Sequence, residues 1–238
     1  MKAIMISIKP KWCAKIMNGE KTIEVRKNKA LANAIQKLID ENGYADIYVY
    51  CSKDDKNILF YQFVNYGDDS EEYYDIAPLK DLIVENEEVF NGKVAFKFRC
   101  YKVEEIKIHF LNKQLTYRIA SRYDYTTKSL SNSQLKKLSC LSNDEMNNYF
   151  KYVYDKNVVG TAIPISNLEI FDRPKELSEF KRPQECWYDD HNMCKEEKCS
   201  YYWTERCGEY IETGCSKYDG YATVTKAPQN FCYCEVVE

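Results

Sequence analysis

The opening residues of the chain show a strand pattern of apolar positions followed by a helical one. Residues 3–8 are almost continuously apolar and predict a buried strand. Pro10 suits the first turn of a helix, where its missing N–H costs nothing. Large apolar side chains then recur at helical spacing, at Trp12, Ile16 and Met17. The pattern therefore predicts a short helix directly after the first strand.

A glycine stop and a second strand follow this helix. Gly19 is suited to end the helix, and residues 21–26 then alternate between apolar and polar side chains. Because side chains of a strand alternate between its faces, Glu24 and Arg26 are expected on the same side. Lys21 is expected at the corner between helix and strand. The sequence thus brings a cation, a carboxylate and a guanidinium together, which suits a planar polar ligand such as a nucleobase.

The later chain contains further strand patterns and two helical ones. Apolar spacing over residues 31–39 predicts an amphipathic helix that ends near Gly43. Ser142 and Glu145 have the spacing of a capping box, which predicts a helix through Tyr152. Strands are predicted over residues 46–51, 58–64, 92–103, 158–171 and 231–237. The sum is an α+β chain, mainly β, consistent with a small closed or nearly closed barrel.

Three segments interrupt this pattern. The acidic segment 66–90 is expected to be an insertion or lid, helical in part around residues 78–85, and residues 112–133 show no clear element. Residues 182–227 differ in kind because they are rich in cysteine. We therefore expect one domain formed by residues 1–181 and 228–238, with residues 182–227 as a cysteine-rich insertion.

The opening motif resembles that of ASCH-domain proteins, in the PUA-like superfamily. The resemblance lies in Ser-Ile-Lys-Pro-Lys-Trp followed by Asn-Gly-Glu-Lys-Thr-Ile-Glu-Val-Arg. The family signature of a glycine, a lysine, a glutamate and an arginine is matched by Gly19, Lys21, Glu24 and Arg26. Residues 165–180 and 227–233 resemble the variant of this family that is common in bacteriophages and prophages.

The resemblance implies a fold and two kinds of activity. PUA-like domains are pseudo-β-barrels with helices at one end, and the family implies binding of RNA or of a modified nucleotide. Some relatives are acetylcytidine amidohydrolases, in which a lysine acts with a threonine and a distal glutamate. Lys21 matches the lysine and is the candidate catalytic residue. Glu24 stands where the threonine is expected, and Glu145 is a candidate for the distal glutamate.

Two interpretations of the opening site remain open at this point. In the first, Lys9, Trp12, Lys21, Glu24 and Arg26 bind a ligand, with Glu24 accepting from an exocyclic amine and Arg26 donating to an oxygen. In the second, Glu24 and Arg26 form a salt bridge on an exposed strand, Lys21 is a solvated turn residue and Trp12 belongs to the core.

Charge and composition narrow the class of protein. The chain has 238 residues and a net charge of −3, so general attraction to nucleic-acid phosphates is not expected. Residues 2–29 nevertheless hold eight basic and two acidic residues, and residues 66–90 hold nine acidic residues and one lysine. No window contains the roughly 20 apolar residues of a membrane span. We expect a protein of the cytoplasm, in a bacterial host if a phage encodes it, with no membrane partner.

The cysteines of residues 186–215 suggest a metal site. Their spacing contains no CxxC pair, so structural zinc, disulfides and free thiols all remain open. A reducing cytoplasm disfavours disulfides, and a polar segment of this length needs a cross-link to become ordered. Zinc is therefore the favoured cofactor. The preferred ligands are Cys194, Cys199, Cys207 and Cys215, with Cys186 and His191 as substitutes and Cys232 or Cys234 as further options.

Three functions follow from these observations. The first is a module that binds RNA or a nucleotide at the opening motif. The second is an amidohydrolase that acts on a modified nucleoside such as acetylcytidine. The third is a phage accessory protein that binds a host factor through the acidic or the cysteine-rich segment.

Overall fold

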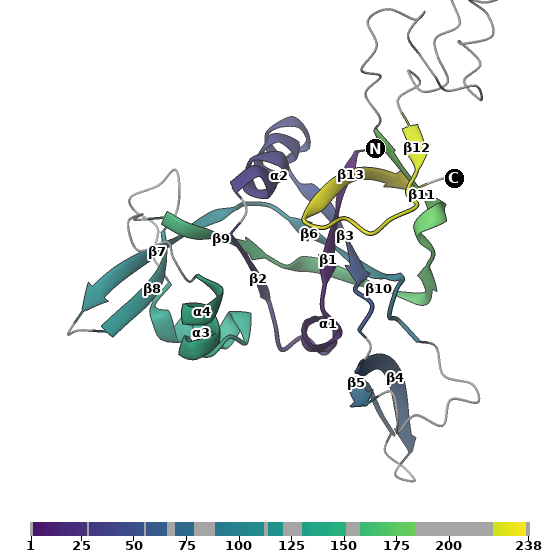
Figure 1. Ribbon diagram of the computed structural model, residues 1–238, viewed down its shortest axis with the longest axis horizontal. Coiled ribbons are helices and arrows are strands. Elements are labelled where there is room, and N and C mark those ends of the chain that lie inside the picture. The colour runs from purple at the N-terminus through teal and green to yellow at the C-terminus, as the bar shows by residue number, and fades with distance from the viewer. Residues whose placement is uncertain are drawn as a thin grey trace, which may run out of the picture.

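The computed structural model describes an α+β chain built mainly from strands (Figure 1). It describes residues 2–27, 29–54, 56–65, 70–78, 89–111, 114–120, 130–150, 158–183 and 221–236. The helices are α1 (Pro10–Met17), α2 (Lys29–Asn42), α3 (Asn132–Ser139), α4 (Asn143–Tyr149) and the one-turn η2 (Leu177–Glu179). The strands are β1 (Ala3–Ile8), β2 (Ile23–Arg26), β3 (Ala45–Cys51), β4 (Asn57–Asn65), β5 (Ser70–Pro78), β6 (Val94–Cys100), β7 (Glu104–Leu111), β8 (Gln114–Ala120), β9 (Val158–Pro164), β10 (Ser166–Lys175), β11 (Phe180–Pro183), β12 (Tyr221–Thr223) and β13 (Phe231–Val236).

The described strands form three open sheets. The largest has the order β10-β6-β3-β1-β13-β11-β12, the second β2-β9-β7-β8, and β4 pairs with β5 alone. Only β1 and β3 are parallel; the other described pairs are antiparallel. The first two sheets are continuous through two chain segments, because β6 runs into β7 and β9 runs into β10. Strand β2 lies near the end of β1, where Arg26 donates to the carbonyl of Ser7.

Two clusters of buried side chains pack on either side of β2. The first lies between the large sheet and helices α1 and α2, and includes Ile4, Ile6, Ile16, Leu38 and Phe96. The second lies between the four-stranded sheet and helices α3 and α4, and consists of Ile23, Val25, Ile106, Leu135, Met146, Phe150 and Ala162. A third cluster lies on the other face of the large sheet and includes Met5, Phe180 and Cys234. Helices α3 and α4 thus stand opposite α1 across β2 (Figure 1).

Most of the elements predicted from the first 65 residues are confirmed. The chain forms the predicted strand–helix–strand unit, and Gly19 ends α1 with a φ of +74° and an N–H donated to the carbonyl of Ile16. Helix α2 buries Leu31, Ala34, Ile35 and Leu38 and is followed by Gly43 at a φ of +82°. The capping box of Ser142 and Glu145 is present at the start of α4.

The acidic and polar segments contain elements that the sequence pattern did not reveal. Residues 70–78 form β5, which extends along β4 over its whole length. Residues 114–120 form β8, and residues 132–139 form α3, with its own capping box at Ser131. The predicted helix around residues 78–85 lies largely outside the described residues.

The cysteine-rich segment is held at both ends by the large sheet. Its start lies in β11 and β12 lies near its end; β11 pairs with β12 and with β13. The predicted zinc ligands, from Cys186 through Cys215, lie outside the described residues, as does His191. Among the described residues, no helix is both long enough and apolar enough to cross a membrane.

Gly160 allows β9 to approach α4 closely, which generates a stability prediction. A Cβ at this position would lie 2.5 Å from Phe150 Cε1 and 2.8 Å from the backbone oxygen of Arg26. We expect Gly160→Ala to reduce the free energy of unfolding by roughly 1–3 kcal/mol through overpacking, as measured by urea denaturation.

Two further variants distinguish the steric effect of the added methyl group from the other effects of replacing a glycine by alanine. Gly43→Ala meets no atom within 4 Å, so its cost reports only the left-handed backbone. Phe150→Leu removes the ring edge that the new methyl group would meet. If the changes in the free energy of unfolding caused by Gly160→Ala and Phe150→Leu simply add in the double variant, the predicted contact between the new methyl group and the Phe150 ring is contradicted.

Candidate functional site: a pocket between two diverging strands

A pocket of about 530 Å³ opens where β1 and β2 diverge around α1. This volume lies within the range of small-molecule sites. Its walls come from the end of β1, the start of α1, strand β2 and the segment that includes α4. The lining residues are Ser7, Ile8, Lys9, Trp12, Lys21, Glu24, Val25, Arg26, Leu141, Glu145, Asn148 and Tyr149. The five residues predicted to bind a ligand, Lys9, Trp12, Lys21, Glu24 and Arg26, all belong to this lining.

Lys21 lies at the inner end of the pocket and is almost completely buried. The turn after Gly19 places it there, and its side chain is 2% exposed. Its ammonium group donates to the carbonyl oxygens of Ile23 at 2.8 Å and Ser139 at 2.9 Å. Glu24 Oε2 lies 3.3 Å away. Two of the three N–H donors of the ammonium therefore have backbone acceptors, and the contact with Glu24 is an ion pair.

Glu24 joins the two cations of the pocket. Its Oε1 atom lies 2.7 Å from Nε of Arg26, and its Oε2 faces Lys21. The contact with Nε is an ion pair without the N–H direction of a hydrogen bond. Arg26 also donates from Nη2 to the carbonyl oxygen of Ser7 at 2.8 Å. The guanidinium therefore connects β2 to the end of β1 at the point where the two strands separate.

The buried salt bridge corrects the second interpretation of the opening motif. The ion pair between Glu24 and Arg26 exists, but Glu24 is 9% and Arg26 17% exposed, so the strand face is not a solvated one. Lys21 is not a solvated turn residue either. Trp12 is partly buried, packs against the first core cluster and also lines the pocket.

Two aromatic rings in the pocket wall, those of Trp12 and Tyr149, have lysine ammonium groups close to them. The ammonium groups of Lys11 and Lys21 lie 4.5 and 5.4 Å from the ring centroid of Trp12. The ammonium of Lys27 lies 4.8 Å from the ring centroid of Tyr149. Burial raises the pKa of the Tyr149 phenol, which therefore stays neutral at physiological pH.

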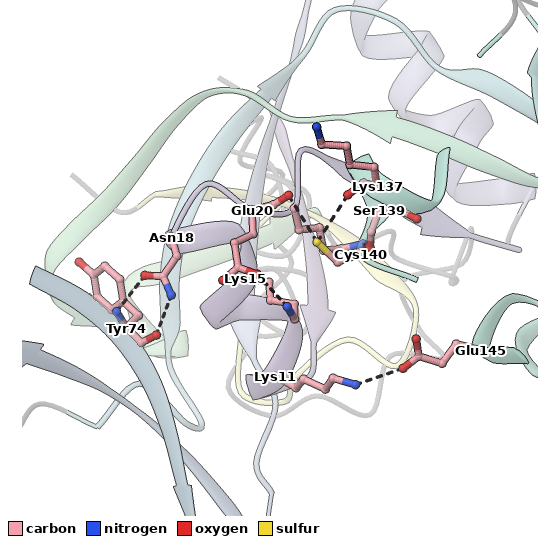
Figure 2. Close-up of polar contacts among 10 residues, drawn as sticks. Lys11, Lys15, Asn18, Glu20, Tyr74, Lys137, Ser139, Cys140 and Glu145 are labelled. Atoms are coloured by element: carbon pink, nitrogen blue, oxygen red, sulfur yellow. Dashed lines mark hydrogen bonds and ion pairs between the residues drawn. The ribbon is translucent and has the colours of Figure 1, made fainter. Parts of the chain in front are cut away.

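Glu145 reaches the pocket from α4 and pairs across it with α1. Figure 2 shows its carboxylate facing Lys11, with 3.1 Å between Nζ and Oε1. The backbone N–H of Ser142 and then Lys11 lower the pKa of Glu145, so it is a carboxylate at neutral pH. Its side chain is 39% exposed, so the ion pair holds α1 and α4 together only weakly.

The C-terminal end of α1 and the turn after it make further polar contacts (Figure 2). Lys15 and Glu20 form an ion pair at 2.8 Å. The thiol of Cys140 donates to the carbonyl of Glu20 at 3.4 Å. Cys140 is partly buried and forms the left-handed C-cap of α3 with a φ of 55°. Cys13, Cys51 and Cys100 are buried.

Sequence reasoning did not find several of the lining residues. Asn148 and Tyr149 lie in the predicted helix that begins at the Ser142 capping box, but nothing in the sequence indicates that this helix faces Trp12. Ser7 and Val25 lie on predicted strands and contribute backbone groups, which residue types do not reveal. Within the described part of the chain, no group of three or more histidine, cysteine or acidic side chains is placed to hold a metal ion.

The triad of Lys21, Glu24 and Arg26 should be essential for stability. We expect Glu24→Gln to reduce the free energy of unfolding by about 3–5 kcal/mol, because it leaves two buried cations without their counter-ion. Chemical denaturation of both proteins measures the difference. Glu20→Gln is the matched control: it makes the same change in the exposed pair with Lys15 and should cost about 1 kcal/mol or less. Equal effects of the two substitutions would refute a buried, coupled triad.

Comparison with known proteins gives no match for the chain: no family profile, curated protein or solved structure is similar to it.

Proposed function

We propose that the pocket binds a nucleotide, either free or as one unit of a single-stranded RNA, within a PUA-like ASCH domain. The observation that carries the proposal is the convergence of Lys21, Glu24 and Arg26 on one pocket of nucleotide size. The two sheets that share the β6–β7 and β9–β10 segments, with α3 and α4 at one end, support the proposed fold.

Each wall of the pocket supplies a contact that a nucleotide needs. Trp12 and Tyr149 offer aromatic rings beside the polar floor, and bases stack on such rings. Glu24 retains lone pairs that accept from an amine or hydroxyl of the ligand. Arg26 has further N–H groups beside the one donated to Ser7.

The charge of the pocket favours an anionic ligand. Its lining holds Lys9, Lys21 and Arg26 against Glu24 and Glu145, which leaves one positive charge in excess. Lys9 is exposed at the rim, at the N-cap of α1, and suits a phosphate at the mouth. Binding at this rim is expected to be weakened by salt.

The amidohydrolase is a second candidate because Lys21 and Glu145 line the same pocket. The contacts of Lys21 and the ionisation of Glu145 support binding more than hydrolysis. The ammonium of Lys21 donates to two backbone carbonyls and pairs with Glu24, and a nucleophilic neutral amine would give up that ion pair. Glu145 has a lowered pKa and is ionised at neutral pH, which does not suit a general acid.

The rim lysine provides a test of nucleotide binding. We expect adenosine or cytidine 5′-monophosphate to bind more tightly than its nucleoside, as measured by isothermal titration calorimetry. Lys9→Ala should remove most of that difference, roughly 1 kcal/mol or about fivefold in Kd, and leave nucleoside affinity unchanged. Lys37→Ala, on the exposed face of α2, is the matched control. Absence of binding up to about 1 mM nucleotide, a free energy of roughly −4 kcal/mol, would overturn the proposal.

A turnover assay separates the two candidates. We expect no release of acetate from N4-acetylcytidine above the uncatalysed rate, because the side-chain nitrogen of Lys21 is engaged by two backbone carbonyls and by Glu24. Release of acetate that Glu145→Gln abolishes, with the affinity for the nucleoside retained, would establish the hydrolase instead.

A further inference from the structure

The backbone of β2 has one edge that faces away from β9. Ile23 lies opposite Pro164, which has no N–H, and the carbonyl of Thr22 accepts from the N–H of Ile165. In an antiparallel pair, hydrogen-bonded residues alternate with residues whose backbone groups point outward. The backbone groups of Glu24 and Arg26 therefore point toward β9. Those of Ile23, Val25 and Lys27 point the other way.

Both ends of this outward edge are occupied by side chains. The carbonyl of Ile23 accepts from the ammonium of Lys21 at 2.8 Å. At the other end, the ring of Tyr149 lies beside Lys27, whose ammonium is 4.8 Å from the ring centroid. The bond to the carbonyl of Ile23 agrees with the alternation set by the strand register. Val25 lies between the two ends, and its N–H and C=O have no hydrogen-bond partner among the described residues.

These two backbone groups of Val25 lie at the pocket. Val25 belongs to the pocket lining, and the residue as a whole is only 5% exposed. Its side chain packs in the cluster with Met146 and Phe150, so the strand register leaves its backbone edge as the part that borders the pocket. A backbone donor and acceptor at a buried position need a partner, either a ligand or water.

The length of the open edge decides which ligand fits. A peptide that adds to a sheet needs a run of backbone partners along the edge. Here Lys21 and Tyr149 occupy both ends, so one donor and one acceptor remain, side by side on one residue. A planar heterocycle with an adjacent acceptor and donor matches this pair. The Watson–Crick edge of a nucleobase is such an edge.

We infer that the backbone N–H and C=O of Val25 bind the Watson–Crick edge of an unpaired adenine or cytosine. This inference rests on the nucleotide-binding function proposed above. The N–H donates to the ring nitrogen, N1 of adenine or N3 of cytosine, and the C=O accepts from the exocyclic amine. Glu24 in the same wall favours an amine over the carbonyl of uracil, because carbonyl lone pairs face its negative charge. A base in a duplex has this edge occupied, so the pocket selects single strands.

Ligand analogues test the donor contact. Replacement of the ring nitrogen by CH, as in the 5′-monophosphates of 1-deazaadenosine and 3-deazacytidine, removes only the acceptor. We expect each to bind about threefold to tenfold more weakly than its parent, the effect of one hydrogen bond. The monophosphate of 7-deazaadenosine, altered on the opposite edge, should bind like its parent, and uridine monophosphate should bind more weakly than cytidine monophosphate.

Selective labelling tests the same contact from the protein. In protein labelled with ¹⁵N-valine, saturation with adenosine or cytidine monophosphate should shift the Val25 amide and slow its hydrogen exchange. The amide of Val49, within the large sheet, is the control. Parent nucleotides that bind while the deaza analogues bind equally well and Val25 is unchanged would overturn this inference alone and leave water at the edge. Failure of both parent nucleotides to bind would overturn the proposed function and this inference together.

Discussion

The structure around β2 depends on the burial of three charged side chains in one connected group. Lys21, Glu24 and Arg26 have little contact with solvent, and taking charges out of water is costly unless each finds partners. The cations divide one carboxylate between them and complete their bonding with backbone carbonyls. Those carbonyls belong to β1, β2 and the end of α3. The electrostatic requirement of the triad thus holds three segments in fixed relative positions.

The same triad explains why a pocket can persist where two strands separate. Strand β1 is paired on both sides by β3 and β13, so β2 cannot join it and pairs with β9 instead. The guanidinium of Arg26 spans the resulting gap by donating to Ser7. A polar contact takes the place of a continuous strand ladder, and the space beside it remains open. Well-packed apolar residues often replace buried ion pairs without loss of stability, so retention of the charges agrees with a role in binding.

Local signals made the first part of the fold predictable. Pro10, Gly19 and the period of the apolar residues indicated α1 and β2 directly, and the spacing of Ser142 and Glu145 indicated α4. Strand β5 was missed because its acidic residues suggested a solvated insertion, although Tyr74 and Ile76 give it a face that packs against the first core cluster. Residues 114–120 likewise gave no clear alternation, although the hairpin with β7 forms.

The long-range half of the site could not be obtained from one sequence. The acceptor that completes the bonding of Lys21 is 118 residues away in Ser139, and only the packing of α3 against β2 brings it near. The approach of Tyr149 to Lys27 depends in the same way on Phe150 seating against Gly160. The charged residues of the pocket, Lys21, Glu24 and Arg26, could be predicted from the sequence because the residue type alone determines the charge. The unpaired edge of Val25 is set by strand register, a property of two segments together, so it becomes visible only once β2 and β9 are paired.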